Sequence, residues 1–156
     1  MGLVAARVAM GALYLYEGIG QLAKGWIGGD GLRRMVQSAL DDNAIPGPYR
    51  SFLEDVVIEH AGALTPLIIA GELAVGAALV LGAATRLTAA AALVMNANFY
   101  VMNGAVTPGA AIDAVFVVLE APLIVWAARQ ALSIDRALAR RGVARWWLSG
   151  DVREAA

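Results

Sequence analysis

Apolar residues in this sequence gather in four long stretches, and each is long enough to form a membrane-spanning helix. They cover about residues 3–23, 63–81, 87–102 and 110–131. A bilayer core of about 30 Å is crossed by about 20 apolar residues in an α-helix, which satisfies its own backbone hydrogen bonds in lipid. The pattern therefore predicts an all-α membrane protein with a bundle of four transmembrane helices in residues 1–131.

The connections between these stretches are unequal. Residues 82–86 leave room only for a tight turn, and residues 103–109 are rich in turn formers. The first connection, residues 24–62, is longer and contains apolar residues at helical spacing: Tyr49, Phe52, Leu53, Val56 and Val57. We expect an extracytoplasmic amphipathic helical connection that lies on the membrane surface or caps the bundle. A flexible loop is the alternative.

Basic residues near the ends of the stretches predict the orientation. Six arginines lie between Arg129 and Arg153, whereas residues 103–109 contain no Lys or Arg. Because cytoplasmic loops are enriched in Lys and Arg, both termini are expected in the cytoplasm. Residues 132–156 combine arginines with apolar residues and the pair Trp146-Trp147, which predicts a helix at the level of the lipid headgroups. Docking to a cytoplasmic partner is the other interpretation of this tail.

Composition agrees with a membrane protein and excludes several chemistries. The 156 residues are 60% hydrophobic and 16% charged, whereas soluble domains are about half apolar and a quarter charged. Cysteine is absent and His60 is the single histidine, so disulfides, iron–sulfur clusters, thiolate-bound zinc and haem are not expected. We predict no metal site. The net charge of −1 argues against a nucleic-acid partner.

Polar side chains inside the apolar stretches are the candidate functional residues. Glu17, Glu72 and Glu120 lie roughly 9–15 Å below the extracytoplasmic ends of their helices at 1.5 Å per residue, and Asn96 lies near the same level. An ionisable side chain at mid-membrane costs at least about 2.5 kcal/mol, so it normally faces a cavity or a partner. We expect these groups to converge, as a ligand or proton site, as polar contacts that lock the bundle, or as a contact with a partner.

Helical spacing adds further candidates. Some share a helix face with the polar residues, and others are small enough to let a neighbouring helix approach closely. They are Gln21, Tyr100, Gly71 and Gly76. Arg86 is a candidate counter-charge for the carboxyls, although a long basic side chain near a helix end is expected to reach the membrane interface.

Two sequence motifs resemble the DoxX/DoxD family. Residues 71–87, GELAVGAALVLGAATRL, contain a G-E-L, a glycine a few residues on, an apolar run and L-G-x-x-T-R-L. Residues 18–22, GIGQL, resemble the family's G-x-x-K-L element with Gln21 in place of the lysine. The resemblance covers about residues 3–130. It implies a four-helix protein of a bacterial or archaeal cytoplasmic membrane. DoxD is a subunit of thiosulfate:quinone oxidoreductase, and DoxX proteins are linked to redox homeostasis.

Two functions follow as hypotheses. In the first, the chain is a quinone-associated redox subunit in which Glu72, Glu17 and Glu120 handle protons and Asn96 and Gln21 bind the ligand. The candidates for packing against a quinone ring are Trp26, Tyr14, Tyr16 and Tyr100. Electrons would come from a partner redox protein or a substrate, because no residues predict a covalent cofactor. The alternative is a non-catalytic accessory or scaffold subunit of a larger respiratory or photosynthetic complex. Enzymatic activity and homo-oligomerisation are left open.

Overall fold

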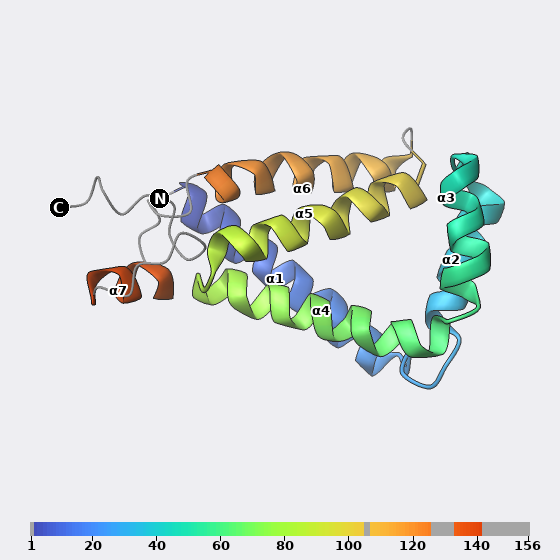
Figure 1. Ribbon diagram of the computed structural model, residues 1–156, viewed down its shortest axis with the longest axis horizontal. Coiled ribbons are helices and arrows are strands. Elements are labelled where there is room, and N and C mark those ends of the chain that lie inside the picture. Colours follow the sequence, from blue (N-terminus) through green and yellow to red (C-terminus); the bar gives the residue numbers. More distant parts are fainter. Residues whose placement is uncertain (1, 105–106, 126–132, 142–156) are drawn as a thin grey trace.

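A computed structural model describes residues 2–104, 107–125 and 133–141, and this part of the chain is helical without strands. The helices are α1 (Gly2–Ala23), α2 (Gly31–Asp42), α3 (Gly47–Phe52), α4 (Ala61–Leu81), α5 (Thr85–Met102), α6 (Pro108–Val125) and α7 (Ile134–Arg140) (Figure 1). A π-helical segment, η1 (Leu53–Ile58), follows α3 directly. The prediction of an all-α fold is confirmed.

The four predicted apolar stretches coincide with α1, α4, α5 and α6, and each helix begins one or two residues earlier than predicted. Thr85 and Pro108 account for two of these earlier starts, because polar residues and proline are tolerated in a first helical turn. Two of the described helices, α1 and α4, are long and apolar enough by composition to cross a membrane. Residues 126–131 of the fourth stretch lie outside the described part of the chain.

The four long helices form two packed pairs, α1 with α4 and α5 with α6. Within the first pair, Gly11 and Gly76 face each other, and a Cβ on Gly76 would lie 2.8 Å from the carbonyl oxygen of Gly11. Glycine is therefore what allows the two backbones to approach so closely. A Cβ on Gly71, the other predicted interface glycine, would have no neighbour within 4 Å.

The two pairs meet at a narrow end and separate at an open end. At the narrow end, α4 and α5 are joined by a turn in which Gly82 and Ala84 have left-handed φ angles of 65° and 46°. From this turn the two helices diverge like the arms of a V (Figure 1). Side chains from both pairs form a core near the narrow end, including Met10, Leu79 and Leu123.

The long first connection closes the open end of the V. It consists of α2, α3 and η1, which we call the cap and which lies across the diverging ends of α4 and α5 (Figure 1). Leu53 and Val57 are buried in a core that the cap shares with the bundle, whereas Phe52 and Val56 are 45% and 41% exposed. Val56 therefore departs from the predicted apolar face, because the turns of the π-helical segment are wider than those of an α-helix. Phe52 lies at the end of α3, before that segment.

At the narrow end, α7 lies beside the turn between α4 and α5. The backbone N–H of Asp135 donates to the carbonyl oxygen of Gly82 at 3.1 Å. Most of the predicted interfacial tail, including Trp146 and Trp147, lies outside the described residues. Its assignment as a separate segment, residues 132–156, stays a prediction.

Candidate functional site

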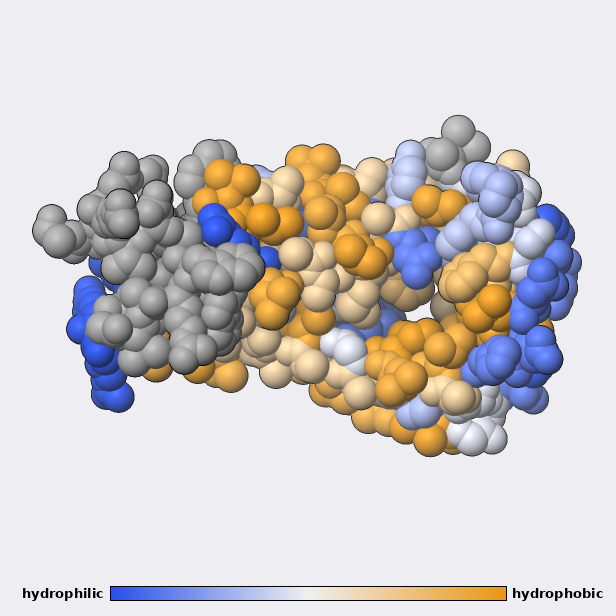
Figure 2. Space-filling view, viewed as in Figure 1, coloured by the Kyte–Doolittle hydropathy of each residue, from blue (hydrophilic) through white to orange (hydrophobic). Residues whose placement is uncertain are grey.

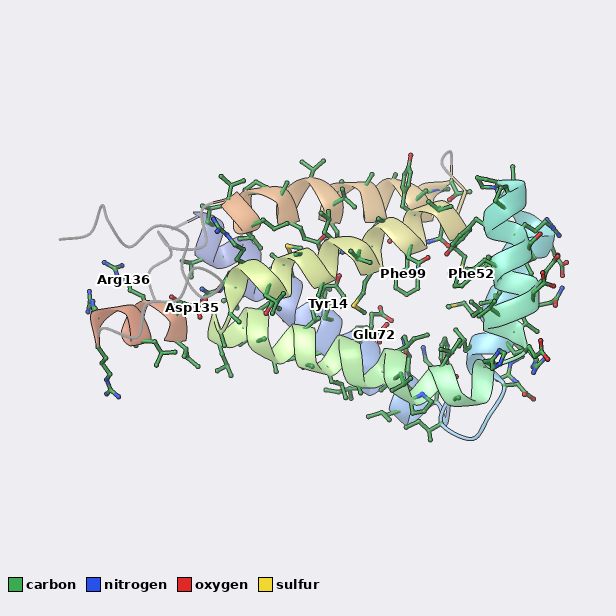
Figure 3. All side chains as sticks on the ribbon, viewed as in Figure 1. Tyr14, Phe52, Glu72, Phe99, Asp135 and Arg136 are labelled. Atoms are coloured by element: carbon green, nitrogen blue, oxygen red, sulfur yellow. The ribbon has the colours of Figure 1, made fainter. Side chains whose placement is uncertain are left out.

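Gln21 on α1 and Glu72 on α4 form the first polar contact inside the bundle. Gln21 Nε2 donates to Glu72 Oε1 at 3.1 Å, and the Glu72 side chain is 3% exposed. Gly18 makes this contact possible, since a Cβ there would lie 2.9 Å from Leu73 on α4. Figure 3 shows Glu72 directed into the angle between α4 and α5.

This contact leaves two buried acceptors without a hydrogen-bond partner. No described group donates to Glu72 Oε2 or to Gln21 Oε1. A buried polar atom of this kind costs about 1–3 kcal/mol, so native proteins rarely retain one without a reason. Both atoms can accept a hydrogen bond from a hydroxyl group, and Glu72 could donate one to a carbonyl group when its carboxyl holds a proton.

A second polar group lies closer to the narrow end and connects the two helix pairs. Asn96 Nδ2 donates to Glu120 Oε1 at 2.5 Å and lies 2.7 Å from the Tyr14 hydroxyl. That hydroxyl has two acceptors within reach, Glu120 Oε1 at 3.3 Å and the carbonyl of Ala92 at 3.1 Å. Glu120 is fully buried, and its Oε2 accepts no hydrogen bond from a described group.

The predicted convergence of three carboxyls therefore takes a different form. Glu72 and Glu120 belong to separate hydrogen-bonded groups on opposite arms of the V, and Glu17 is exposed on α1 without a hydrogen bond in the described chain. Depth along the bundle is similar for these residues, but the rotation of each helix directs their side chains differently. Tyr100 is half-buried outside both groups, and Arg86 Nε donates to the carbonyl of Ile124 at 3.0 Å.

Sequence reasoning missed the hydrogen-bonding role of Tyr14. It considered this side chain only as a surface for ring packing, whereas the hydroxyl connects α1 to both α5 and α6. A signal was present in the sequence, because Tyr14 and Gln21 are seven residues apart and share one face of α1. That spacing would have placed Tyr14 on the inward face.

An apolar chamber of about 260 Å³ lies between the cap and the diverging arms. Gln21 lines it together with the aromatic side chains of Trp26 after α1, Tyr49 and Phe52 in the cap, and Phe99 on α5. Figure 3 shows Phe52 and Phe99 approaching each other across this space, and the space-filling view shows an opening there between apolar surfaces (Figures 2 and 3). An apolar cavity of about 150 Å³ holds benzene, so this chamber accommodates one substituted ring.

The cap is attached to α5 at the edge of the chamber. The Tyr49 hydroxyl donates to the side chain of Asn98, and Asn43 Nδ2 donates to the carbonyl of Met102 at 3.1 Å. Burial raises the pKa of the Tyr49 hydroxyl, so it remains a donor at neutral pH. These bonds fix the cap over the open end of the V.

Most of the chain matches one known protein family. The model of the DoxX family matches residues 2–105, which include α1, the cap, α4 and α5. The chain belongs to the DoxX family. Neither the search of curated proteins nor the search of solved structures found a match. Family membership establishes a membrane protein in contact with the lipid bilayer.

The surface of this DoxX-family chain agrees with that environment. Large apolar side chains are exposed on the outer faces of the long helices, including Leu67 on α4, Val94 on α5 and Val118 on α6, at 67%, 69% and 69%. Figure 2 shows apolar surface along the helices and hydrophilic surface over the outside of the cap. Lipid contact explains why such side chains are not buried within the chain.

Proposed function

We propose that this DoxX-family chain is a quinone-associated redox subunit whose ligand lies in the chamber, with its ring beside Glu72 and Gln21. One observation carries the proposal: Gln21, which lines an apolar chamber large enough for one substituted ring, donates to Glu72, a buried carboxyl whose other oxygen has no hydrogen-bond partner among the described residues. Ligand sites commonly combine mostly apolar walls with a few convergent polar groups.

The chemistry of these residues suits a quinone. Complete reduction of a quinone takes up two electrons and two protons and converts both carbonyl groups to hydroxyls. Glu72 Oε2 can donate a proton to a carbonyl, or accept a hydrogen bond from the resulting hydroxyl, and Gln21 Oε1 is a second acceptor beside it. The electrons come from a partner redox protein of the membrane, which this proposal requires.

A quinone titration of the purified protein in nanodiscs tests the proposal. Trp26 lines the chamber, so its fluorescence should be quenched when a short-tailed quinone binds. Glu72→Gln is expected to raise Kd about tenfold, which corresponds to about 1.4 kcal/mol. The matched control is Glu59→Gln, at an exposed position next to the bundle, which should bind like wild type.

Two results would contradict this function. Equal quinone affinity of wild type and Glu72→Gln would show that Glu72 does not take part in binding. A wild-type protein that ignores quinone, yet purifies in fixed stoichiometry with a large respiratory or photosynthetic complex, would identify an accessory subunit instead.

We also infer that α1, α4, α5 and α6 each span a bacterial or archaeal cytoplasmic membrane, with both termini in the cytoplasm and the cap outside. The alternating directions of the four helices support this topology (Figure 1), and so do the arginines after α6. Because cysteine is absent, single cysteines at exposed Ser38 and Ala137 report on each side. An impermeant maleimide should label Ser38→Cys in intact cells and Ala137→Cys only after lysis; the reverse pattern would refute the orientation.

A further inference from the structure

A buried carboxylate from α7 binds the turn between α4 and α5. Asp135 accepts hydrogen bonds from the backbone N–H groups of Ala84 and Thr85, both at 2.7 Å, and its own N–H donates to Gly82 at 3.1 Å. Its side chain is 2% exposed. Asp135 lies beyond residues 2–105, which match the DoxX model, so the family match does not account for this contact.

The turn that Asp135 holds has an unusual backbone conformation. Ala84 has a left-handed φ of 46°, which residues other than glycine rarely adopt. Asp135 accepts from the N–H of this residue and from the first amide of α5, where a negative charge is favourable at a helix N-terminus. The carboxylate therefore stabilises the conformation that sets the direction in which α5 leaves α4.

The same turn is enclosed by α1. Arg7 is 1% exposed and packs against the turn so closely that a Cβ on Gly82 would lie 2.4 Å from Arg7 Nη1. Segments from the beginning, the middle and the end of the described chain thus meet at the narrow end. The chamber is lined by cap residues, and the cap crosses the opposite end of the same two arms (Figure 1).

Because α4 is long, a small rotation at the turn moves its far end by a large distance. An α4 helix of 21 residues is about 31 Å long, so a rotation of about 10° at the turn moves its far end by about 5 Å. A change of that size is comparable to the width of one aromatic ring. A small change in the angle at the turn therefore changes the separation of the arms at the chamber by several ångströms.

We propose that Asp135 is a positioning residue: by holding the α4–α5 turn, α7 sets the separation of the two arms at the chamber and thereby controls ligand access. The ligand part rests on the proposed function, whereas the separation of the arms is a property of the protein alone. The C-terminal segment thus regulates a site at the other end of the bundle.

Distance measurements by pulsed electron spin resonance test this proposal without a ligand. The chain has no cysteine, so spin labels can be placed at exposed Ala63 on α4 and Ala111 on α6, near the open end of each arm. Asp135→Asn, which cannot accept both N–H bonds with carboxylate geometry, should shift or broaden the label distance by about 5 Å. Arg136→Gln, exposed on the same helix, should leave the distance at its wild-type value.

A double variant separates positioning from general stabilisation. Glycine adopts left-handed φ freely, so Ala84→Gly should restore stability to the Asp135→Asn protein without restoring the hold of α7 on the turn. Positioning predicts that this double variant regains its unfolding temperature yet keeps the altered label distance. Recovery of both would show a merely structural role and overturn the proposal.

Three further outcomes complete the test. An unchanged label distance in Asp135→Asn would mean that the cap alone sets the separation of the arms, and the proposal would fall. In nanodiscs, the Kd for a short-tailed quinone should change several-fold in Asp135→Asn. An unchanged Kd would exclude the proposal that Asp135 controls ligand access to the chamber. If no variant binds quinone but the distances respond, the proposed function fails while the positioning role of Asp135 stands.

Discussion

The contact between Gly11 and Gly76 predicts a sharp sensitivity of the α1–α4 pair to a single methyl group. In Gly76→Ala, the new Cβ would lie 2.8 Å from the Gly11 carbonyl oxygen and 2.9 Å from the backbone nitrogen of Leu15. Ordinary contacts begin at 3.4 Å, so the helices must separate by about 0.6 Å. Because backbone atoms cannot rotate away as a side chain does, we expect a loss of about 1–3 kcal/mol in the free energy of unfolding.

This loss can be measured by reversible unfolding in mixed micelles, where it corresponds to roughly a 5- to 150-fold change in the equilibrium constant. Gly71→Ala is the matched control on the same helix, because its Cβ would meet nothing within 4 Å. It should be neutral or slightly stabilising, since alanine favours the helix. Equal stability of the two variants would refute the assignment of Gly76 to a close helix contact.

Two further predictions concern polar groups. Glu120→Ala leaves the Asn96 amide and the Tyr14 hydroxyl with one acceptor fewer in the core, and should lower the free energy of unfolding by about 1–3 kcal/mol. Glu120→Gln keeps an acceptor oxygen and should lower it less. Equal losses in the two variants would contradict this interpretation. Tyr49, whose pKa is raised by burial, contributes stability that is present below the unfolded pKa of about 10 and is lost as pH rises above it. Unfolding between pH 8 and pH 11 should therefore show a weaker alkaline loss in Tyr49→Phe than in wild type, and identical profiles would exclude this role of Tyr49.

The four long helices were predictable because length and apolarity are local properties of the sequence. Which residues of the cap face the core was not predictable, since this depends on a π-helical segment that the composition of the sequence does not indicate. In η1 the buried residues Leu53 and Val57 are four apart, but their neighbour Val56 is turned outward. A 3.6-residue period assigned all three to one face, and the wider turns of the π-helix separated them.

The candidate site was predictable only in part. Counting residues from helix ends gives depth, and depth correctly placed Glu72 and Glu120 inside the bundle. It carries no information about the rotation of each helix relative to its neighbours. Glu17 and Gln21 share a helix face by spacing, yet Gln21 bonds to Glu72 while Glu17 is exposed. Pairing between helices requires the fold, because it depends on the direction in which α1 crosses α4 at Gly11.

The residues of the L-G-x-x-T-R-L motif have structural roles, so membership of the family predicts the fold more directly than it predicts a reaction. In L-G-x-x-T-R-L, Gly82 supplies the left-handed turn that Arg7 packs against, Thr85 is fully buried at the start of α5, and Arg86 binds the carbonyl of Ile124 on α6. All three residues lie at the narrow end: Gly82 belongs to the turn that joins the two arms, Thr85 begins α5, and Arg86 joins α5 to α6 within one arm. None of them touches the chamber, whose walls come largely from the cap and from the diverging ends of α4 and α5. The L-G-x-x-T-R-L part of the motif therefore specifies the V, while the G-E-L part supplies Glu72, and most of the residues that line the chamber lie outside both motifs.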